Sequence, residues 1–310
     1  MSKVPSDRRV VVTSLLVSVS DVFLNLLVGL VTGSQTMIAQ ALQGVSDLTT
    51  ASVLYVGVER SRKLPDGRHP LGYGREVFFW VLLAGMFMFL GTGLLSVYFG
   101  YRQVVDPGLI DNIGLAFAML TFGLVTNVYA FSRSFIRLAN TGKGKAAWKR
   151  QLLGSSMVET KATFTLDFLG SFSAILGILA LLLYVITGDA RFDGLGGIMV
   201  GLSMMTAAVA LIVDVKSLIV GRTAPPATQK KIAALVESQP HVLSVLDLRT
   251  IFLGSSKMLI LVEVHLEDEL KTDQIEKVLD RIKAVLAKEV PSAYHIQVEV
   301  ETPDDELLGR

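Results

Sequence analysis

Six long apolar segments constrain the fold of this chain more than any other feature of its sequence. They cover approximately residues 10–32, 36–58, 77–100, 111–135, 152–186 and 192–220. The hydrocarbon core of a bilayer is about 30 Å thick, and a helix crosses it with about 20 residues. Because every segment reaches that length, the sequence predicts an α-helical membrane protein with six transmembrane helices. The first segment has no small-residue cleavage site, so we expect a membrane anchor and not a cleaved signal peptide.

Basic residues in the connections predict the orientation in the membrane. The connections after the second and fourth segments are rich in Lys and Arg, whereas the three alternate connections contain at most one Arg each. Short cytoplasmic loops carry an excess of basic residues. We therefore expect both basic connections and both termini on the cytoplasmic side, in an inner or plasma membrane of bacterial type. The basic residues concerned are Arg60, Arg62, Lys63, Arg68 and Arg75, then Arg137, Lys143, Lys145, Lys149 and Arg150.

The character of the chain changes after Gly221, where Thr223–Pro226 ends the last apolar segment. Two domains are predicted: a transmembrane domain over residues 1–222 and a cytoplasmic α+β domain over residues 223–310. Helical and alternating periodicities predict the order α-β-β-α-β for the second domain, with both helices on one face of the sheet. The predicted elements are a helix at 226–238, strands at 242–252 and 258–266, a helix at 273–288 and a strand at 294–300.

Composition excludes several functions. A net charge of +1 argues against a nucleic-acid partner, and the absence of cysteine excludes thiolate zinc sites and disulfides. No nucleophile elbow, phosphate-binding glycine loop or HExxH sequence is present, so we expect a protein that is not an enzyme and has no catalytic or cofactor-binding residues.

Two polar pairs lie inside the apolar segments. Asp47 follows Gln43 by four residues, and Asp167 follows Thr163 by the same spacing, which places each pair on one face of a helix. A charged side chain at the centre of a bilayer costs about 2.5–3.5 kcal/mol on insertion scales, so it marks a functional site by default. The alternative is that these side chains make polar contacts between helices. If the two pairs meet, they hold a cation between them.

Several motifs together resemble the cation diffusion facilitator family over nearly the whole chain. The six predicted helices and the α-β-β-α-β domain are similar to the architecture of that family. The local matches are Thr32–Ser34 with Ala41–Asp47, His69–Glu76, Thr163–Asp167 followed by Gly170, Ser171 and Gly177, and Leu246–Thr250.

The resemblance implies a transport site made of Gln43, Asp47, Thr163 and Asp167. It also implies proton-coupled export of a divalent metal, and a homodimer joined through a ferredoxin-like or metallochaperone-like cytoplasmic domain. In the family, His or Asp usually occupies the positions that carry Gln43 and Thr163 here. An amide and a hydroxyl either supply neutral oxygen ligands or only bond to their own or a neighbouring helix.

Other polar residues are further candidates. Asp21 and Asn25 line the same cavity or pack between helices, and Glu159 lies on an entry path or reaches toward water. Asp66 and His69 form a weak second metal site, because Tyr73 occupies the position where a second histidine is expected. For the cytoplasmic domain we expect a weak metal site or none.

The donor types bear on the choice of cation. Carboxylate, amide and hydroxyl oxygens suit Mn²⁺, Mg²⁺ and Fe²⁺ better than Zn²⁺, although the family prior favours zinc. We expect Mn, Zn or Fe as the transported substrate, protons as the counter-ion, and membrane lipid as a partner. The alternative is a non-transporting membrane sensor or scaffold with a degenerate metal site, in which the nearby Lys161 replaces the metal.

Overall fold

The computed structural model describes residues 7–140 and 158–303, and the chain divides into two compact units. Among the described residues, the helical unit contains the chain up to Val58, residues 79–140 and Glu159–Val215. The C-terminal unit contains Glu59–Phe78 together with the chain from Lys216 onwards. Each unit has its own packed interior.

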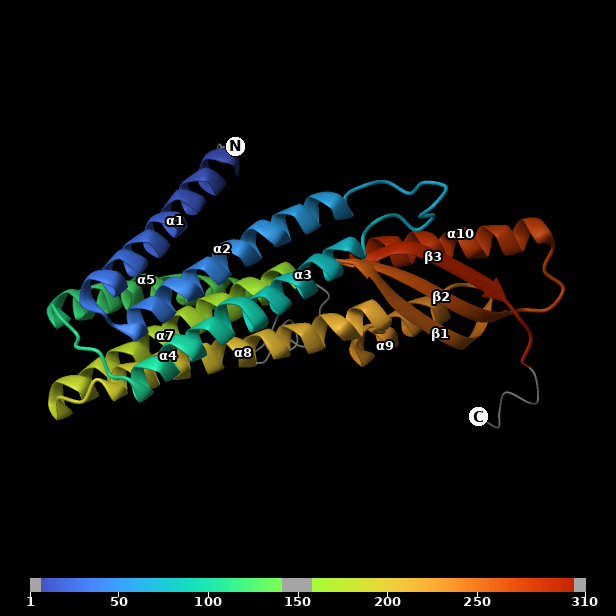
Figure 1. Ribbon diagram of the computed structural model, residues 1–310. Coiled ribbons are helices and arrows are strands. Elements are labelled where there is room, and N and C mark those ends of the chain that lie inside the picture. Colours follow the sequence, from blue (N-terminus) through green and yellow to red (C-terminus); the bar gives the residue numbers. More distant parts are fainter. Residues whose placement is uncertain (1–6, 141–157, 304–310) are drawn as a thin grey trace. The chain divides into compact units, whose positions relative to one another are not determined.

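Within the described residues, long helical runs follow the apolar segments of the sequence (Figure 1). Four of them are long and apolar enough to cross a bilayer over residues 76–105, 113–132, 161–187 and 191–220, and a shorter apolar stretch covers Val19–Thr32. The helices are α1 (Asp7–Thr32), α2 (Gln35–Ser61), α3 (Glu76–Met86) continued by η1 (Phe87–Gly93) and α4 (Leu94–Val105), α5 (Ile113–Asn140), α7 (Val158–Thr187) and α8 (Arg191–Val220).

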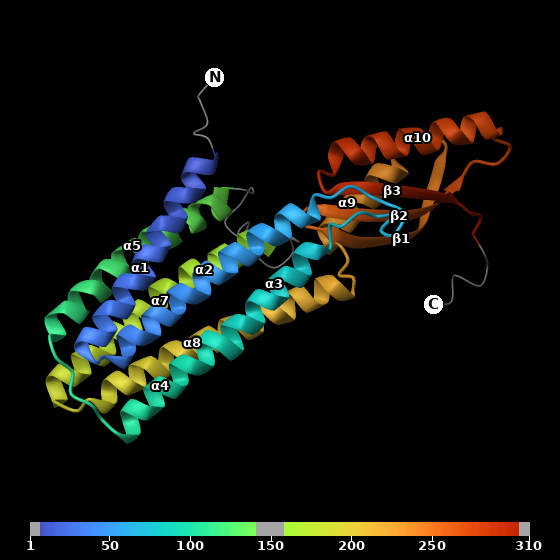
Figure 2. The ribbon, with the colours of Figure 1, turned by 45° about the horizontal axis from the view of Figure 1, so that its top comes forward.

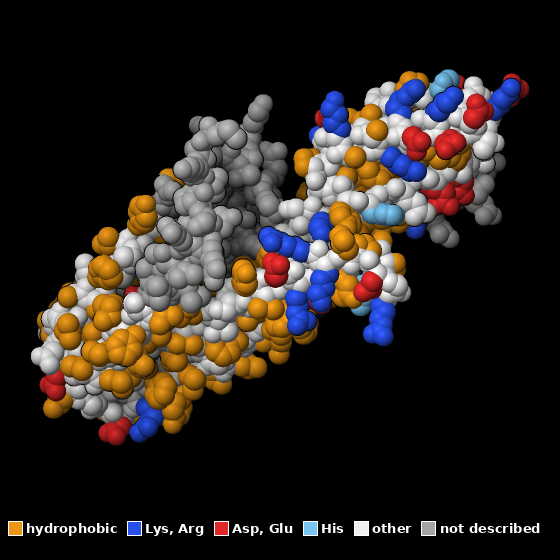
Figure 3. All heavy atoms as spheres, turned by 90° about the horizontal axis from the view of Figure 1, so that it is seen from above, with side chains coloured by type: hydrophobic (Ala, Val, Ile, Leu, Met, Phe, Trp, Pro, Cys, Tyr) orange, Lys and Arg blue, Asp and Glu red, His pale blue; other side chains and the backbone are white. Residues whose placement is uncertain are grey.

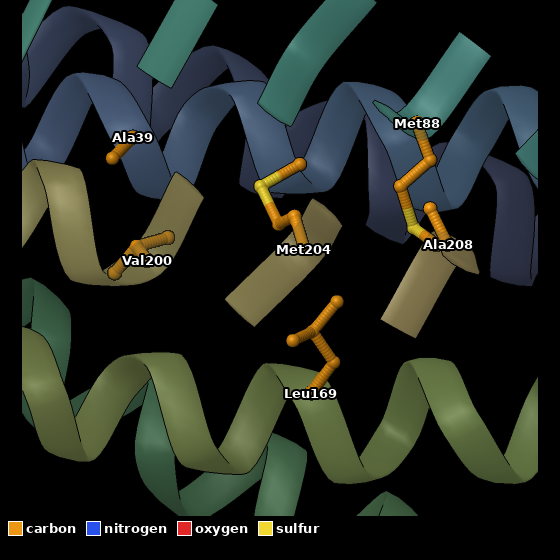
Figure 4. Packing of buried hydrophobic residues seen from close by; sticks show 6 residues of the cluster. All are labelled: Ala39, Met88, Leu169, Val200, Met204 and Ala208. Atoms are coloured by element: carbon orange, nitrogen blue, oxygen red, sulfur yellow. The ribbon is translucent and has the colours of Figure 1, made fainter. Parts of the chain in front are cut away.

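Two apolar clusters stabilise the helical unit. One joins Ala39 of α2 and Leu169 of α7 to Met88 and three residues of α8 (Figure 4). The other joins Val28 and Met37 to α5 and α7. Because these contacts bury one side of each helix, the opposite sides leave many large apolar side chains exposed, as membrane helices do.

Small residues bring α8 close to the run formed by η1 and α4. A Cβ added to Gly201 would lie 2.8 Å from the carbonyl oxygen of Gly93, and one added to Gly100 would lie 2.6 Å from that of Gly194. Ser96 Oγ donates to the carbonyl oxygen of Gly197 at 2.9 Å. Close approach through small residues, with hydroxyl bonds across the contact, is the usual packing of membrane helices. The wide turn η1 is a π-helical insertion at this contact.

The C-terminal unit contains a three-stranded sheet in the order β1-β2-β3, covered by two helices (Figure 2). Strands β1 and β2 pair antiparallel, and β2 and β3 pair parallel because α10 crosses between them. Alternate residues of β2 are buried, so one face of the sheet packs against helices. The predicted order is confirmed, with the elements α9 (Pro226–Glu237), β1 (Val242–Gly254), β2 (Lys257–Leu266), α10 (Thr272–Glu289) and β3 (Ala293–Val300).

The connection at Glu59–Phe78 packs against the turn between β1 and β2. A Cβ on Gly74 would collide with the carbonyl oxygen of Leu253, so the two backbones are in direct contact there. Arg75 Nη2 also donates to the carbonyl oxygen of Ile219 at 3.0 Å. The surfaces of the two units differ: hydrophobic side chains cover the visible face of the helical unit, and charged ones gather on the C-terminal unit (Figure 3).

Candidate metal-binding site in the helical unit

One side of α2 is polar although the helix belongs to an apolar bundle. Gln40, Gln43, Ser46 and Thr50 are all buried and recur at a spacing of three or four residues. Asp47 Oδ1 is buried beside them and has no hydrogen-bond partner within the described part of the chain, and the same is true of Gln40 Nε2 and Ser46 Oγ. Buried polar atoms are nearly always paired in native proteins. Unpaired ones here therefore indicate a place for water or an ion.

Asp47 and Asp167 lie on different helices. Asp47 is close enough to Asp167 of α7 and to Asp21 of α1 for electrostatic repulsion from both. Like charges held together away from water need a cation or protons to offset them.

Gln43 and Thr163 differ in their surroundings. Gln43 is buried, and its Oε1 accepts a hydrogen bond from Ser173 Oγ of α7. Thr163 is exposed, one turn before Asp167. Ser173 was not among the residues selected from the sequence, because a serine in an apolar helix has no distinctive spacing.

The further candidates around this region are placed as follows. Asn25 is buried, and its Nδ2 donates to the backbone carbonyl of Asp21 at 2.9 Å, so that bond is local to α1. Glu159 lies in the first turn of α7, and its side chain is outside the described part of the chain. Among the described residues, no three His, Asp or Glu side chains come together to hold an ion.

Asp66 and His69 lie in the connection at Glu59–Phe78. Asp66 Oδ1 accepts from the N–H groups of Arg68 and His69 at 2.9 and 2.7 Å, and Oδ2 accepts from the Tyr73 hydroxyl at 2.6 Å. The Tyr73 bond, followed by those from the backbone, lowers the pKa of Asp66 to about 2. The His69 ring packs on Tyr73 with their centroids 4.2 Å apart. Asp66 thus closes a turn, and a metal would have to compete with three hydrogen bonds.

Two further acids inside the apolar segments, the buried Asp193 and the partly buried Asp214, were not selected from the sequence. Asp214 of α8 accepts a hydrogen bond from Lys161 Nζ of α7 at 2.9 Å. Asp193, at the start of α8, accepts from Ser34 Oγ and from the N–H of Gln35, each at 2.6 Å. A lone carboxylate in an apolar segment is a usable signal, and both residues carry it.

The apolar helical unit followed by an α+β domain defines the class of integral membrane proteins that carry a second domain after their helices. Residues 11–220 match the model of the cation efflux transmembrane domain, and residues 224–303 match that of the cation efflux protein cytoplasmic domain. The chain belongs to the cation efflux family, also called the cation diffusion facilitators.

Several curated proteins are similar to the chain. It is 24% identical to the proton-coupled zinc antiporter SLC30A9, mitochondrial, of Xenopus laevis, over 93% of the chain and 53% of that protein. It is 22% identical to the magnetosome protein MamM of Magnetospirillum gryphiswaldense, over 88% of the chain and 81% of that protein. The cation-efflux pump FieF of Salmonella agona is also 22% identical, over 84% of the chain and 82% of that protein. The chain spans about half the length of the SLC30A9 relatives.

Among solved structures, the chain is similar to a substituted MamM CTD in its nickel form. The identity is 19%, the match covers 26% of this chain and 100% of the other, and the TM-score is 0.24.

Proposed function

We propose that this chain is a secondary transporter that exports a divalent metal cation from the cytoplasm in exchange for protons. The observation that supports it most directly is the buried, unpaired oxygen of Asp47, held within electrostatic range of Asp167. Two ionised carboxylates in this position repel each other, and a divalent cation between them removes that repulsion. Membership of the cation efflux family supports the same activity.

Asp47 and Asp167 are the proposed metal ligands, with Gln43 and Thr163 as neutral donors. The Gln43 carbonyl oxygen has two lone pairs, so it can bind an ion while Ser173 donates to it. Thr163, which is exposed, contacts the ion as it enters. Asp21 and Asn25 are proposed to line the proton path beside these ligands, with Glu159 at the entrance. Asp66 with His69 is at most a weak second site.

An oxygen-only donor set favours harder ions. Carboxylate and amide oxygens suit Mn²⁺, Mg²⁺ and Fe²⁺, whereas Zn²⁺ prefers nitrogen and sulfur. We therefore propose Mn²⁺ or Fe²⁺ as substrates. Zn²⁺ is their competitor, since the similar SLC30A9 protein is named as a zinc antiporter.

Proton coupling follows from the same two carboxylates. A metal ligand must be deprotonated, so metal and protons compete for Asp47 and Asp167. In the proposed cycle the acids lose protons and bind the metal from the cytoplasm, the bundle reopens outward, and reprotonation there releases the metal. A homodimer joined through the C-terminal domain, with termini in the cytoplasm, completes the proposal.

Metal uptake into proteoliposomes tests this function. We expect an imposed proton gradient to drive Mn²⁺ transport by the purified chain in exchange for protons. The flux should collapse when an ionophore dissipates that gradient. Asp47→Asn and Asp167→Asn keep side-chain size, remove the charge, and should reduce the flux to background. Asp111→Asn, which changes an exposed acid outside the helices, is the matched control and should leave the flux unchanged.

Two results would contradict the proposal. If Asp47→Asn still transports metal at the wild-type rate, the metal does not bind at the proposed site. A folded wild-type chain that carries none of Mn²⁺, Fe²⁺, Zn²⁺ or Mg²⁺ favours the alternative of a membrane sensor or scaffold. In that alternative the Lys161 ammonium replaces the metal. Against it, Lys161 donates a hydrogen bond to Asp214, so its charge is already partly offset by that carboxylate.

A further inference from the structure

α5 places an amide beside the helix that carries Asp167. A Cβ added to Gly170 would lie 2.8 Å from Oδ1, 2.9 Å from Cγ and 3.2 Å from Nδ2 of Asn127. The whole amide group of Asn127 therefore occupies the space that a side chain at position 170 would fill. Only glycine at 170 leaves that space open.

The contacts between α5 and α7 fix the level at which this amide lies. Leu120 contacts Gly177 towards one end of the two helices, and Phe131 packs on Phe164 and Phe168 towards the other, with ring centroids 5.4 and 5.9 Å apart. Asn127 lies between these contacts. Asp167 lies between the levels of Phe164 and Gly170.

Asp167 and Gly170 are also neighbours on the surface of α7. Residues three apart on a helix have Cβ positions about 5–6 Å apart. The Asn127 amide, which covers Gly170, therefore packs on α7 one helical turn from Asp167.

We infer that Asn127 supplies a neutral oxygen to the metal held by Asp47 and Asp167, so that the site is completed from α5. This inference rests on the proposed function and extends it. Among the described residues, no group of three His, Asp or Glu side chains is placed to hold an ion, and Thr163 is exposed. The Asn127 amide oxygen is of the donor type that hard divalent ions accept. The residue therefore helps to determine which metal is carried.

The alternative is that Asn127 only packs helices together, as polar side chains in membranes also do. The two roles differ in what an isosteric change does. Asn127→Leu keeps the volume against Gly170 and removes the oxygen, whereas Asn127→His replaces the oxygen by an imidazole nitrogen, which suits zinc. Thr126→Val is the matched control, because Thr126 is exposed and its hydroxyl bonds only to its own helix at 2.9 and 3.1 Å.

The experiment measures Mn²⁺ and Zn²⁺ transport by the purified full-length chain in proteoliposomes, as a function of metal concentration. Loss of a group that supports a metal site typically weakens binding about 10- to 100-fold. We expect Asn127→Leu to raise the Mn²⁺ concentration at half-maximal transport by about that factor, Asn127→His to shift the preference towards Zn²⁺, and Thr126→Val to do neither.

Unchanged half-saturation and unchanged metal preference in Asn127→Leu and Asn127→His would overturn the inference. If Asn127→Leu does not fold, Asn127→His decides by its Zn²⁺-to-Mn²⁺ ratio, which a packing role would not alter. The proposed function fails separately, when the wild-type chain carries no metal or when Asp47→Asn carries it normally. Transport that depends on Asp47 but ignores every change at Asn127 leaves the function intact and removes only this residue from the site.

Discussion

Asp193 stabilises two helices although it belongs to only one. Its carboxylate, at the start of α8, is fully buried and accepts hydrogen bonds from Ser34 Oγ and the N–H groups of Gln35 and Thr36. The first N–H groups of a helix have no partner inside the helix, and a negative charge there also interacts favourably with the helix dipole. The N-terminus of α2 is thus capped by a residue far along the chain.

Replacing this cap should destabilise the helical unit. Asp193→Asn keeps the shape but removes the charge and turns an amide NH₂ toward groups that are themselves donors. Leaving such groups unpaired costs about 1–3 kcal/mol. We expect chemical denaturation in detergent to show a loss of that size for Asp193→Asn, and a change below about 0.5 kcal/mol for the exposed Asp111→Asn. Equal stability of the two variants would mean that the cap contributes nothing.

The sequence also predicted part of the candidate site at this scale. Asp47 and Asp167 could be selected because each follows a polar residue by one helical turn inside an apolar segment. Asn127 and Ser173 have no such local pattern, since their partners lie on other helices. Tertiary packing, which no single segment encodes, decides what such residues contact.

At the scale of elements, the ion pair between Lys161 and Asp214 joins α7 to α8. The Lys161 side chain is 8% exposed and that of Asp214 25%, and their charged atoms are 2.9 Å apart. Removing one partner of a buried pair leaves a charge without compensation, whereas removing both does not. The pair therefore fixes how these two helices pack.

A double-mutant cycle measures this contribution. We expect Lys161→Met and Asp214→Met each to cost about 3 kcal/mol, the low end for buried pairs, because Asp214 keeps some contact with solvent. The double variant should be less destabilised than the sum of the two by about 1–3 kcal/mol. The measurement is denaturation of the full-length chain in detergent, and strictly additive losses would show that the pair is not coupled.

The elements themselves were largely predictable. Apolar length predicted the long helices of the described residues, four of which are long and apolar enough to cross a bilayer. Alternation predicted the three strands of the C-terminal domain in their observed order. The π-helical turn η1 was not predicted, because one extra residue in a turn leaves no signal in the hydrophobic periodicity of the sequence. The turn lies where Gly93 contacts α8. By hydropathy and length, α2 is not among the spans identified in the described helices, since its polar stripe offsets its apolar residues.

At the scale of the whole molecule, the basic connections predict which ends of the helices face the cytoplasm. Residues 59–78, which carry five basic side chains, belong to the same compact unit as the C-terminal domain. The connections at residues 106–112 and 188–190 contain none. If both termini are cytoplasmic, residues 59–78 lie on the cytoplasmic side of the membrane and the connections at residues 106–112 and 188–190 lie on the opposite side.

The absence of cysteine makes this orientation directly measurable. Single cysteines replace exposed residues: Arg68→Cys and Ser238→Cys on the expected cytoplasmic side, and Leu109→Cys and Arg191→Cys on the other. We expect a membrane-impermeant maleimide to label the last two in intact cells and the first two only in inverted vesicles. Labelling of Arg68→Cys and Leu109→Cys from the same side would refute the six-span arrangement.

The inward-facing polar stripe of α2 has a consequence for biogenesis. An isolated segment that carries Gln40, Gln43 and Asp47 is poorly suited to insertion. The acid at its centre by itself costs about 2.5–3.5 kcal/mol. Its polar side is sheltered only when the neighbouring helices are present, as the Gln43 bond to Ser173 of the much later α7 illustrates. We therefore expect α2 to insert stably only together with its neighbouring helices. In newly made chains that end before α7, α2 should remain in the bilayer poorly.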